Sequence, residues 1–242
     1  MHCITVAVGF ADILRRTLPR NRRHFDAVLL VTSAEVADDE VATIAADHSC
    51  DVLRTNVFYA DGAAFNKFAA LEEAVSQLTL HDWVCFLDAD ILLPCDTSEQ
   101  VAKLQPGCIY NPPRRMLLDA FGEIPPQSRW CELPLGPPAV TGNIMAGYMQ
   151  IFHAGDAVLQ QRPWYDLDLS NASDGDTRFA RRWAKRDRRR PGFEVCHLGP
   201  DSVNWCGRVI PYADGSKPPQ ADIRMTQVRE FLAARAAGQT KR

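Results

Sequence analysis

A short apolar run that ends in two carboxylates sets the framework of this sequence. Residues 83–87 (WVCFL) are continuously apolar and too few for a helix, which is typical of a strand buried on both faces. Asp88 and Asp90 follow directly. In an open parallel sheet, the carboxyl ends of the strands form the ligand-binding edge. Two neighbouring carboxylates repel there unless a cation lies between them and an anionic ligand, so the pattern predicts a divalent metal held for a phosphate.

An Asp-x-Asp triplet is weak evidence when it stands alone. The chain contains two more, at residues 166–168 and 174–176, and neither of these follows a predicted buried strand. The alternative for Asp88 and Asp90 is a solvated turn, because turns favour Asp. The position after a buried strand is what favours the metal site.

Strand and helix patterns alternate along the first half of the chain. Strands are predicted at residues 4–8, 26–31 and 51–55 before the run at 83–87. Helices are predicted between them, at residues 12–23, from the capping pattern of Thr32, Ser33 and Glu35 to residue 47, and from Asn66 onward. This alternation predicts an α/β fold with a mixed, mostly parallel central sheet flanked by helices. The chain has no P-loop or dinucleotide fingerprint.

Length and composition suit one large domain. The chain has 242 residues, of which 46% are hydrophobic and 24% are charged. Its eight cysteines are scattered without a C-x-x-C pair, which indicates buried thiols in a reducing compartment rather than disulfides or a zinc site. The N-terminus lacks the basic region of a signal peptide, and no apolar run approaches a membrane span. We therefore expect a cytoplasmic protein with no membrane partner.

The second half of the chain changes in character. Residues 111–140 contain seven of the 16 prolines and are predicted to form a long irregular binding loop. A strand follows at residues 148–152, with Gln150 on its polar side. Gly142 and Gly147 lie just before it and suit either close approach of the backbone to a ligand or a bulge.

Charged residues gather in two places that need an explanation. Lys67 is in the first turn of a predicted helix, where a cation opposes the helix dipole. A nearby anion explains it, and a solvated lysine is the alternative. Residues 174–190 hold eight of the 27 lysines and arginines, as a solvated surface or a site for a polyanion. They include a predicted helix at residues 176–186. The tail beyond residue 214, with a helix at 222–236, is expected to contribute least to chemistry.

Four segments together resemble a known family. They are DAVLLVTS, FNKFAALEEAV, DWVCFLDADILLP, and SDGDTRFARRW together with HLGPDSVNWCGR. The chain resembles nucleotide-sugar-dependent glycosyltransferases of the GT-A fold, in particular small soluble ones of bacterial and phage type, over most of residues 4–208. The resemblance implies a single Rossmann-like GT-A domain and a hexosyltransferase type of activity. Residues 1–110 would form the nucleotide-sugar-binding half, 111–214 the acceptor-binding half, and 215–242 a C-terminal tail.

The resemblance also implies roles for individual residues. Asp88, Asp90 and His197 would hold Mn²⁺ or Mg²⁺ against the donor diphosphate, and one imidazole favours Mn²⁺. Asp176 would be the general base, with Asp174 as the neighbour that could act instead. The family often has Glu-Asp where this chain has Gly175-Asp176, so inversion and retention at the anomeric centre both stay open. The nucleoside-diphosphate sugar, with a UDP-sugar favoured, would contact these residues: Val8, Gly9, Thr32, Ser33, Lys67, Asp88 and Ala89.

The predicted acceptor-binding residues are Arg114, Arg115, Tyr148, Gln150 and Arg178. Their arginines could bind phage DNA with hydroxymethylated bases, or another anionic polymer. One alternative is a sugar nucleotidyltransferase, although residues 9–20 lack the Gly-rich, Arg-containing phosphate loop that it needs. A phosphohydrolase with an Asp nucleophile would carry the motif after its first strand. A non-catalytic protein that binds nucleic acid or another polyanion is the third alternative. The sequence does not indicate an oligomeric state.

Overall fold

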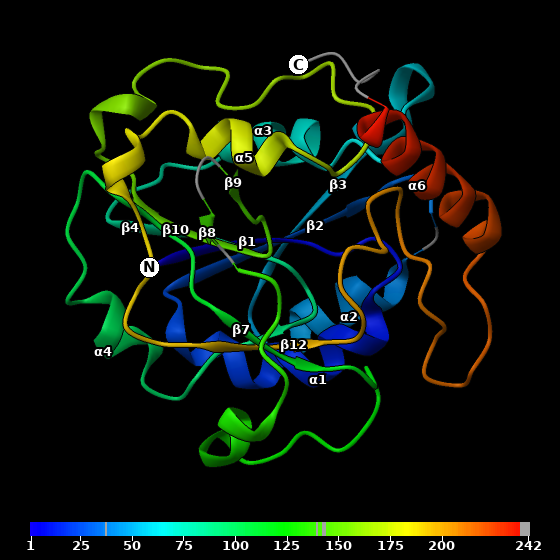
Figure 1. Cartoon of the computed structure of the whole chain (residues 1–242), viewed down its shortest axis with the longest axis horizontal. Coiled ribbons are helices and arrows are strands. Elements are labelled where there is room, and N and C mark those ends of the chain that lie inside the picture. The colour runs from blue at the N-terminus through cyan, green and yellow to red at the C-terminus, as the bar shows by residue number, and fades with distance from the viewer. Residues whose placement is uncertain (37, 139, 142–143, 238–242) are drawn as a thin grey trace.

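The main sheet has seven strands in the order β11-β6-β10-β4-β1-β2-β3 (Figure 1). The structure is a computed structural model that describes residues 1–36, 38–138, 140–141 and 144–237. Four neighbouring strands are parallel: β1 (His2–Val6), β2 (Ala27–Ser33), β3 (Asp51–Thr55) and β4 (Trp83–Leu87). Antiparallel β10 (Met149–His153) separates β4 from β6 (Ile109–Tyr110), and β11 (Arg188–Arg189) pairs with β6 in parallel. The predicted mixed, mostly parallel sheet is confirmed.

Helices cover both faces of this sheet. α1 (Ala11–Asn21) and α2 (Asp39–Asp47) lie on one side, and α3 (Lys67–Ser76) and α5 (Gly175–Ala180) on the other (Figure 1). A short helix, α4, spans Thr97–Val101. The 3₁₀ turns are at Arg22–His24, Val57–Gly62, Gln127–Glu132, Ala157–Leu159 and Lys185–Asp187.

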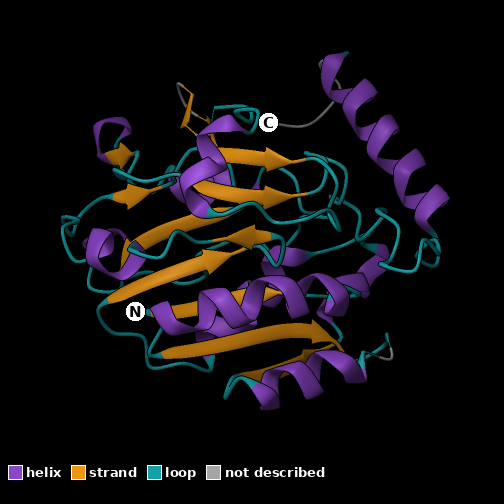
Figure 2. Cartoon of the chain, turned by 90° about the horizontal axis from the view of Figure 1, so that it is seen from below, coloured by secondary structure: helices purple, strands orange, loops and turns teal. Residues whose placement is uncertain are grey.

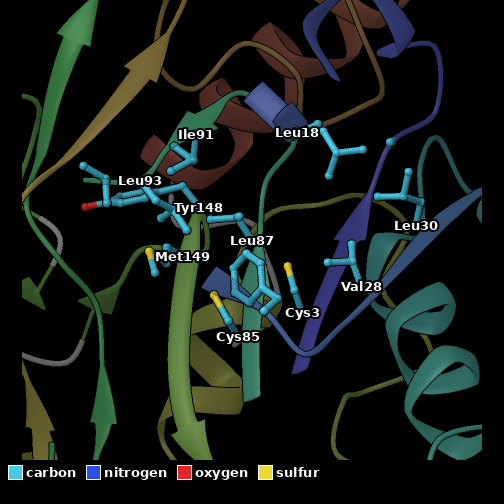
Figure 3. Packing of buried hydrophobic residues seen from close by; sticks show 14 of the residues in the cluster. Cys3, Leu18, Val28, Leu30, Cys85, Leu87, Ile91, Leu93, Tyr148 and Met149 are labelled. Atoms are coloured by element: carbon cyan, nitrogen blue, oxygen red, sulfur yellow. The ribbon is translucent and has the colours of Figure 1, made fainter. Parts of the chain in front are cut away.

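Alternate residues of each central strand face opposite cores. Cys3 and Cys85 pack with Leu18 in the core on the α1 side (Figure 3). Ile4 and Phe86, their neighbours along the strands, belong to the core on the side of α3 and α5. A strand with both faces buried must be apolar at every position, which explains the continuous run at residues 83–87.

A second sheet of three strands lies beside the first. It is ordered β5-β12-β7, with β12 (Val195–Leu198) antiparallel to β5 (Ile91–Leu92) and parallel to β7 (Arg114–Leu117). A two-stranded ribbon joins β8 (Val140–Thr141) to β9 (Ile144–Met145). The expectation that residues 111–140 are wholly irregular is therefore wrong. They supply β7, and Trp130 packs into a small core under β5 and β12.

Some predicted boundaries differ from the observed ones. The helix expected from the Thr32-Ser33 pattern begins only at Asp39, because Ser33 stays in β2 and its hydroxyl accepts hydrogen bonds from the Glu35 and Val36 amides in a local turn. The helix expected at residues 176–186 ends at Ala180. Just beyond it, Arg182 donates hydrogen bonds to carbonyls of the 158–164 loop. Strand β12 ends at Leu198 and therefore contains His197.

A buried arginine fastens the C-terminal segment to the first strand and helix. Arg208 is 1% exposed and forms a two-pronged ion pair with Asp12 on α1. Its guanidinium also donates to the carbonyl oxygens of Gly9 and Pro211. The loop that follows β12 is thereby held beside the carboxyl end of β1.

The C-terminal helix α6 (Ala221–Ala236) rests on this fastened loop at the outer edge of the molecule (Figure 2). Trp205 meets Phe231 edge-on at 5.9 Å, and Arg224 donates a hydrogen bond to the Arg208 carbonyl oxygen at 2.9 Å. Val228 is buried in the contact. No helix among the described residues has the length and apolarity to cross a membrane.

We expect Asp12→Asn to lower the free energy of unfolding by about 3 kcal/mol, because it leaves the Arg208 charge buried without its counter-ion. Urea denaturation measures the change. Glu40→Gln is the control, since it removes an exposed ion pair with Arg15 and should change stability by about 0.5 kcal/mol or less. Equal effects of the two substitutions would contradict a structural role for the buried pair.

Candidate functional site

The link between β4 and β5 carries both carboxylates of the Asp-x-Asp motif and joins the two sheets. The Asp88 amide donates a hydrogen bond to the Tyr148 carbonyl oxygen at 2.9 Å, which continues the pairing of β4 with β10. The Leu198 amide donates to the Asp90 carbonyl oxygen at 2.8 Å, which ties the same link to β12. The backbone therefore holds both acids where the main sheet meets the second sheet.

Asp90 and His197 face each other in the interior. The Asp90 side chain has its Oδ2 at 3.6 Å from His197 Nε2, and its Oδ1 is buried without a hydrogen-bond partner. His197 Nδ1 lies 3.1 Å from the carbonyl oxygen of Gly199, which can only accept, so Nδ1 carries the proton. With its proton on Nδ1, the neutral form of this imidazole turns the lone pair of Nε2 toward the carboxylate.

This pair fits a divalent cation. A lone pair and a carboxylate oxygen that face each other are stabilised by a cation between them, and a histidine whose other nitrogen donates to a carbonyl is oriented as metal-bound histidines are. Burial raises the pKa of Asp90, His197 opposes that rise, and Asp88 adds to it. A bound cation would favour the ionised carboxylate instead.

Asp88 is held by a lysine. Lys67 Nζ donates a hydrogen bond to Asp88 Oδ1 at 2.6 Å. Burial by itself would lower the pKa of Lys67, but the carboxylates of Asp88 and Asp176 outweigh it and raise that pKa. Asp88 is thus the anion that explains a lysine in the first turn of α3. Across the described residues, no three His, Cys, Asp or Glu side chains are arranged to hold a metal, so the expected trio of Asp88, Asp90 and His197 is not assembled as one cluster.

Asp176 lies in the first turn of α5, against a glycine. A Cβ atom on Gly147 would stand 1.8 Å from the Asp176 carboxyl group, so only glycine allows this contact. The Gln150 side-chain amide donates to the Asp176 carbonyl oxygen at 3.1 Å. Burial raises the pKa of Asp176 to about 6, with Lys67 opposing and with Asp88 and Asp174 adding to the rise.

An open cavity of about 830 Å³ brings most of the predicted site residues together. The predicted residues that line it are Val8, Lys67, Asp88, Ala89, Asp90, Arg114, Tyr148, Asp174, Asp176, Arg178 and His197. Metal, donor, base and acceptor candidates therefore share one space.

Five predicted residues do not line this cavity. Gly9 donates its amide hydrogen to Asp38 Oδ2 at 2.8 Å, and the buried Thr32 hydroxyl donates to the same oxygen at 3.1 Å. Ser33 is buried at the end of β2. Arg115 forms a two-pronged ion pair with Glu194. The fifth, Gln150, is 1% exposed and lies beneath the site, where it supports the backbone of α5.

Arg114 and Tyr148 form part of the cavity wall. The Arg114 guanidinium lies 4.2 Å from the centre of the Tyr148 ring, which is a cation–π contact. It also forms an ion pair with Asp201 at 2.5 Å. Burial raises the pKa of Tyr148, against the opposing effect of Arg114.

Sequence analysis gave no site role to Trp205 and Arg235, and it placed Arg181 only in the basic segment at residues 174–190. Arg181, Trp205 and Arg235 all line the cavity, and Arg235 on α6 pairs with Asp174 at 3.2 Å. The tail, which was expected to contribute least to chemistry, therefore supplies one side chain to the cavity wall. The spacing of Val228 and Phe231 marks a docking face on α6, but nothing in the sequence indicates what it docks against.

Solved structures with related architecture include a galactosyltransferase and two synthases. One is the galactosyltransferase LgtC in complex with donor and acceptor sugar analogues (TM-score 0.48, 14% identity, covering 96% of this chain and 96% of that chain). A second is 4-diphosphocytidyl-2C-methyl-D-erythritol synthase from Anaerococcus prevotii (TM-score 0.45, 11% identity, covering 96% of this chain and 97% of that chain). A third is mannosyl-3-phosphoglycerate synthase from Rubrobacter xylanophilus (TM-score 0.36, 23% identity, covering 50% of this chain and 42% of that chain).

No protein-family model matches the chain, and no curated protein matches it either. The main sheet is mixed and mostly parallel, as expected, with one antiparallel strand beside the Asp-x-Asp strand. The TM-scores of the three structures are below 0.5, so no activity follows from that likeness.

We expect Gly147→Ala to lower the free energy of unfolding by about 2 kcal/mol, because the new methyl group collides with the Asp176 carboxyl group. A double-mutant cycle with Asp176→Ala should recover more than about 1 kcal/mol of that loss, measured by urea denaturation. Gly192→Ala is the matched control, since the nearest atom to its added Cβ is 3.9 Å away. Additive effects in the cycle would show that the contact is not formed.

Proposed function

We propose that this protein is a metal-dependent glycosyltransferase that moves a sugar from a nucleoside-diphosphate sugar to a hydroxyl group of an acceptor. The observation that carries the proposal is the content of the cavity. The cavity is lined by Asp90 and His197, a pair suited to bind a cation, and by the buried Lys67. It is also lined by Asp176, whose carboxyl pKa is raised to about 6. These are the groups needed to stabilise a departing diphosphate and to accept a proton.

Residues 1–110, together with His197, supply the donor side in this proposal. Asp90 and His197 would hold Mn²⁺ or Mg²⁺, and Asp88 would join them by exchanging its Lys67 partner for the cation. The metal, when bound, would stabilise the charge of the departing diphosphate as a Lewis acid. One imidazole among oxygen ligands favours Mn²⁺. Lys67 adds a fixed positive charge beside Asp88. The apolar side chain of Val8 lines the same cavity, and a UDP-sugar is the first donor to test.

Residues 111–214 supply most of the acceptor side. The acceptor oxygen forms a bond to the anomeric carbon as the bond from that carbon to the phosphate oxygen breaks, and the electron pair of the broken bond leaves with the diphosphate. The hydroxyl proton passes to the Asp176 carboxylate. Asp176 is favoured over Asp174 as the base, because Asp174 Oδ1 already pairs with Arg235.

Hydroxymethylated phage DNA remains a candidate acceptor under this proposal. Lys185, Arg186 and Arg189 are exposed near strand β11, as a DNA-binding surface requires. Arg114 and Arg115, however, are engaged in ion pairs. DNA binding through phosphates would weaken steeply with salt.

The eight free thiols favour a reducing compartment such as the cytoplasm.

We expect UDP to bind at least about tenfold more tightly with Mn²⁺ than without it, and Asp90→Asn to abolish that difference by removing a ligand charge. Isothermal titration calorimetry measures both affinities. Asp168→Asn is the matched control, because it alters a second Asp-x-Asp triplet that is exposed and outside the cavity. An unchanged effect of Mn²⁺ in Asp90→Asn would show that the metal assignment is wrong.

Turnover should rise with pH through about 6, because Asp176 can accept a proton only when it is ionised and its pKa is raised to about 6. Rates fall about tenfold per pH unit below that value and reach a plateau above it. Asp176→Asn should lower kcat about 100-fold or more and remove this limb. Asp174→Asn should keep the rise of turnover with pH but move it to lower pH, because removing a neighbouring negative charge lowers the pKa of Asp176. A pH dependence that persists unchanged in Asp176→Asn would exclude Asp176 as the base.

A further inference from the structure

Three arginines line the cavity beside the carboxylates of α5. Arg178 and Arg181 come from α5 and the turn that ends it, three residues apart and so on one face. Arg235 comes from the last turn of α6. Helix geometry carries Arg178 and Arg181 along the α5 axis beyond Asp176, the proposed base. They do not hydrogen-bond to Asp88 or Asp90.

Most of the N–H donors of these three guanidinium groups are not used in ion pairs. Arg178 uses Nη1 for Asp166, at 2.7 Å, and Arg235 uses Nη1 for Asp174, at 3.2 Å. Both ion pairs are partly exposed, so water weakens them. Arg181 has no carboxylate within ion-pair distance among the residues that the structure describes. Arg181 therefore leaves an unbalanced positive charge on the cavity wall, between two arginines whose partners are partly exposed, and an anion would neutralise that charge.

We propose that the acceptor is a small molecule bearing a carboxylate or phosphate group, which Arg178, Arg181 and Arg235 bind. The inference rests on the glycosyltransferase function proposed above and names its substrate class. Guanidinium forks match both anions in geometry, and charge-assisted contacts of this kind are the stronger hydrogen bonds. The anion would be held while the acceptor hydroxyl reaches Asp176.

The surroundings favour a small anion over a polyanion. A cavity of about 830 Å³ is of the size that holds small-molecule ligands. DNA-binding proteins commonly contact six to ten phosphates, as an order of magnitude, whereas this cluster offers three cations. The exposed Arg186 and Arg189 do not line the cavity.

The inference makes α6 part of the acceptor site. Its docking contacts, Trp205 with Phe231 and Arg224 with the Arg208 carbonyl, hold the helix so that Arg235 reaches Asp174. An anion that binds Arg235 would exchange one exposed ion pair for another and leave the docking contacts in place. The helix therefore supplies a binding group without having to move as a whole.

Arginine footprinting tests the site without turnover. Phenylglyoxal would be applied to metal-free protein with and without inorganic phosphate or acetate, and modification mapped by mass spectrometry. We expect at least about threefold protection of Arg181 and Arg235, and none of Arg229 or Arg186, which are exposed and outside the cavity. Equal protection of all four, or of none, would overturn the site. Stronger protection of Arg186 by duplex DNA than of Arg181 by phosphate would favour a polyanion and overturn it too.

Kinetics then separates the inference from the function on which it rests. Metal-dependent release of UDP from UDP-sugars would be measured with glycerol, glycerate and glycerol 3-phosphate as matched acceptor probes. We expect release with the two anionic probes, and a KM for them at least about tenfold higher in Arg181→Ala and Arg235→Ala, with the donor KM and the Arg229→Ala variant unchanged. Equal use of glycerol by all variants would overturn the inference alone. No release with any acceptor, alongside protected arginines, would overturn the proposed function alone.

Discussion

The site depends on one backbone constraint, the clamping of the β4–β5 link between two sheets. A hydrogen bond from the Asp88 amide continues the main sheet, and a hydrogen bond to the Asp90 carbonyl oxygen belongs to the second sheet. The backbone of neither residue can shift without breaking strand pairing. The two acids are therefore held side by side by long-range pairing, despite their repulsion.

Two of the three acids at the site have a basic group beside them. Lys67 balances Asp88, and His197 faces Asp90. Burial raises the pKa of Asp176 to about 6, and the opposing effect of Lys67 offsets only part of that rise. A group that is poised between its charged and neutral forms near neutral pH is suited to proton transfer. Burial of Asp176 thus lowers stability and at the same time suits this carboxyl group to proton transfer.

The C-terminal region completes the cavity through a chain of contacts that begins far away in the sequence. Arg208 fastens the 200–212 loop to Asp12 and Gly9, and α6 rests on that loop through Trp205 and Phe231. Arg235 consequently reaches Asp174. One buried ion pair on the first helix thus helps to position a cationic side chain from the last helix, and α6 supplies part of the cavity wall.

Local patterns were enough to predict the alternating strands and helices, the buried strand at residues 83–87, the Asn66 cap and the carboxylates at the strand end, because periodicity and capping depend on near neighbours. Three other features could not be predicted in this way: the pairing of residues 114–117 with β12, the burial of Gln150, and the place of Arg235 in the cavity wall. Each depends on contacts between residues distant in the chain, whose partners no local spacing identifies. The sequence alone established which chemical groups stand at the ends of strands, whereas tertiary packing decided which of them share a cavity, since only the folded chain brings β4, β12, α5 and α6 within reach of one another.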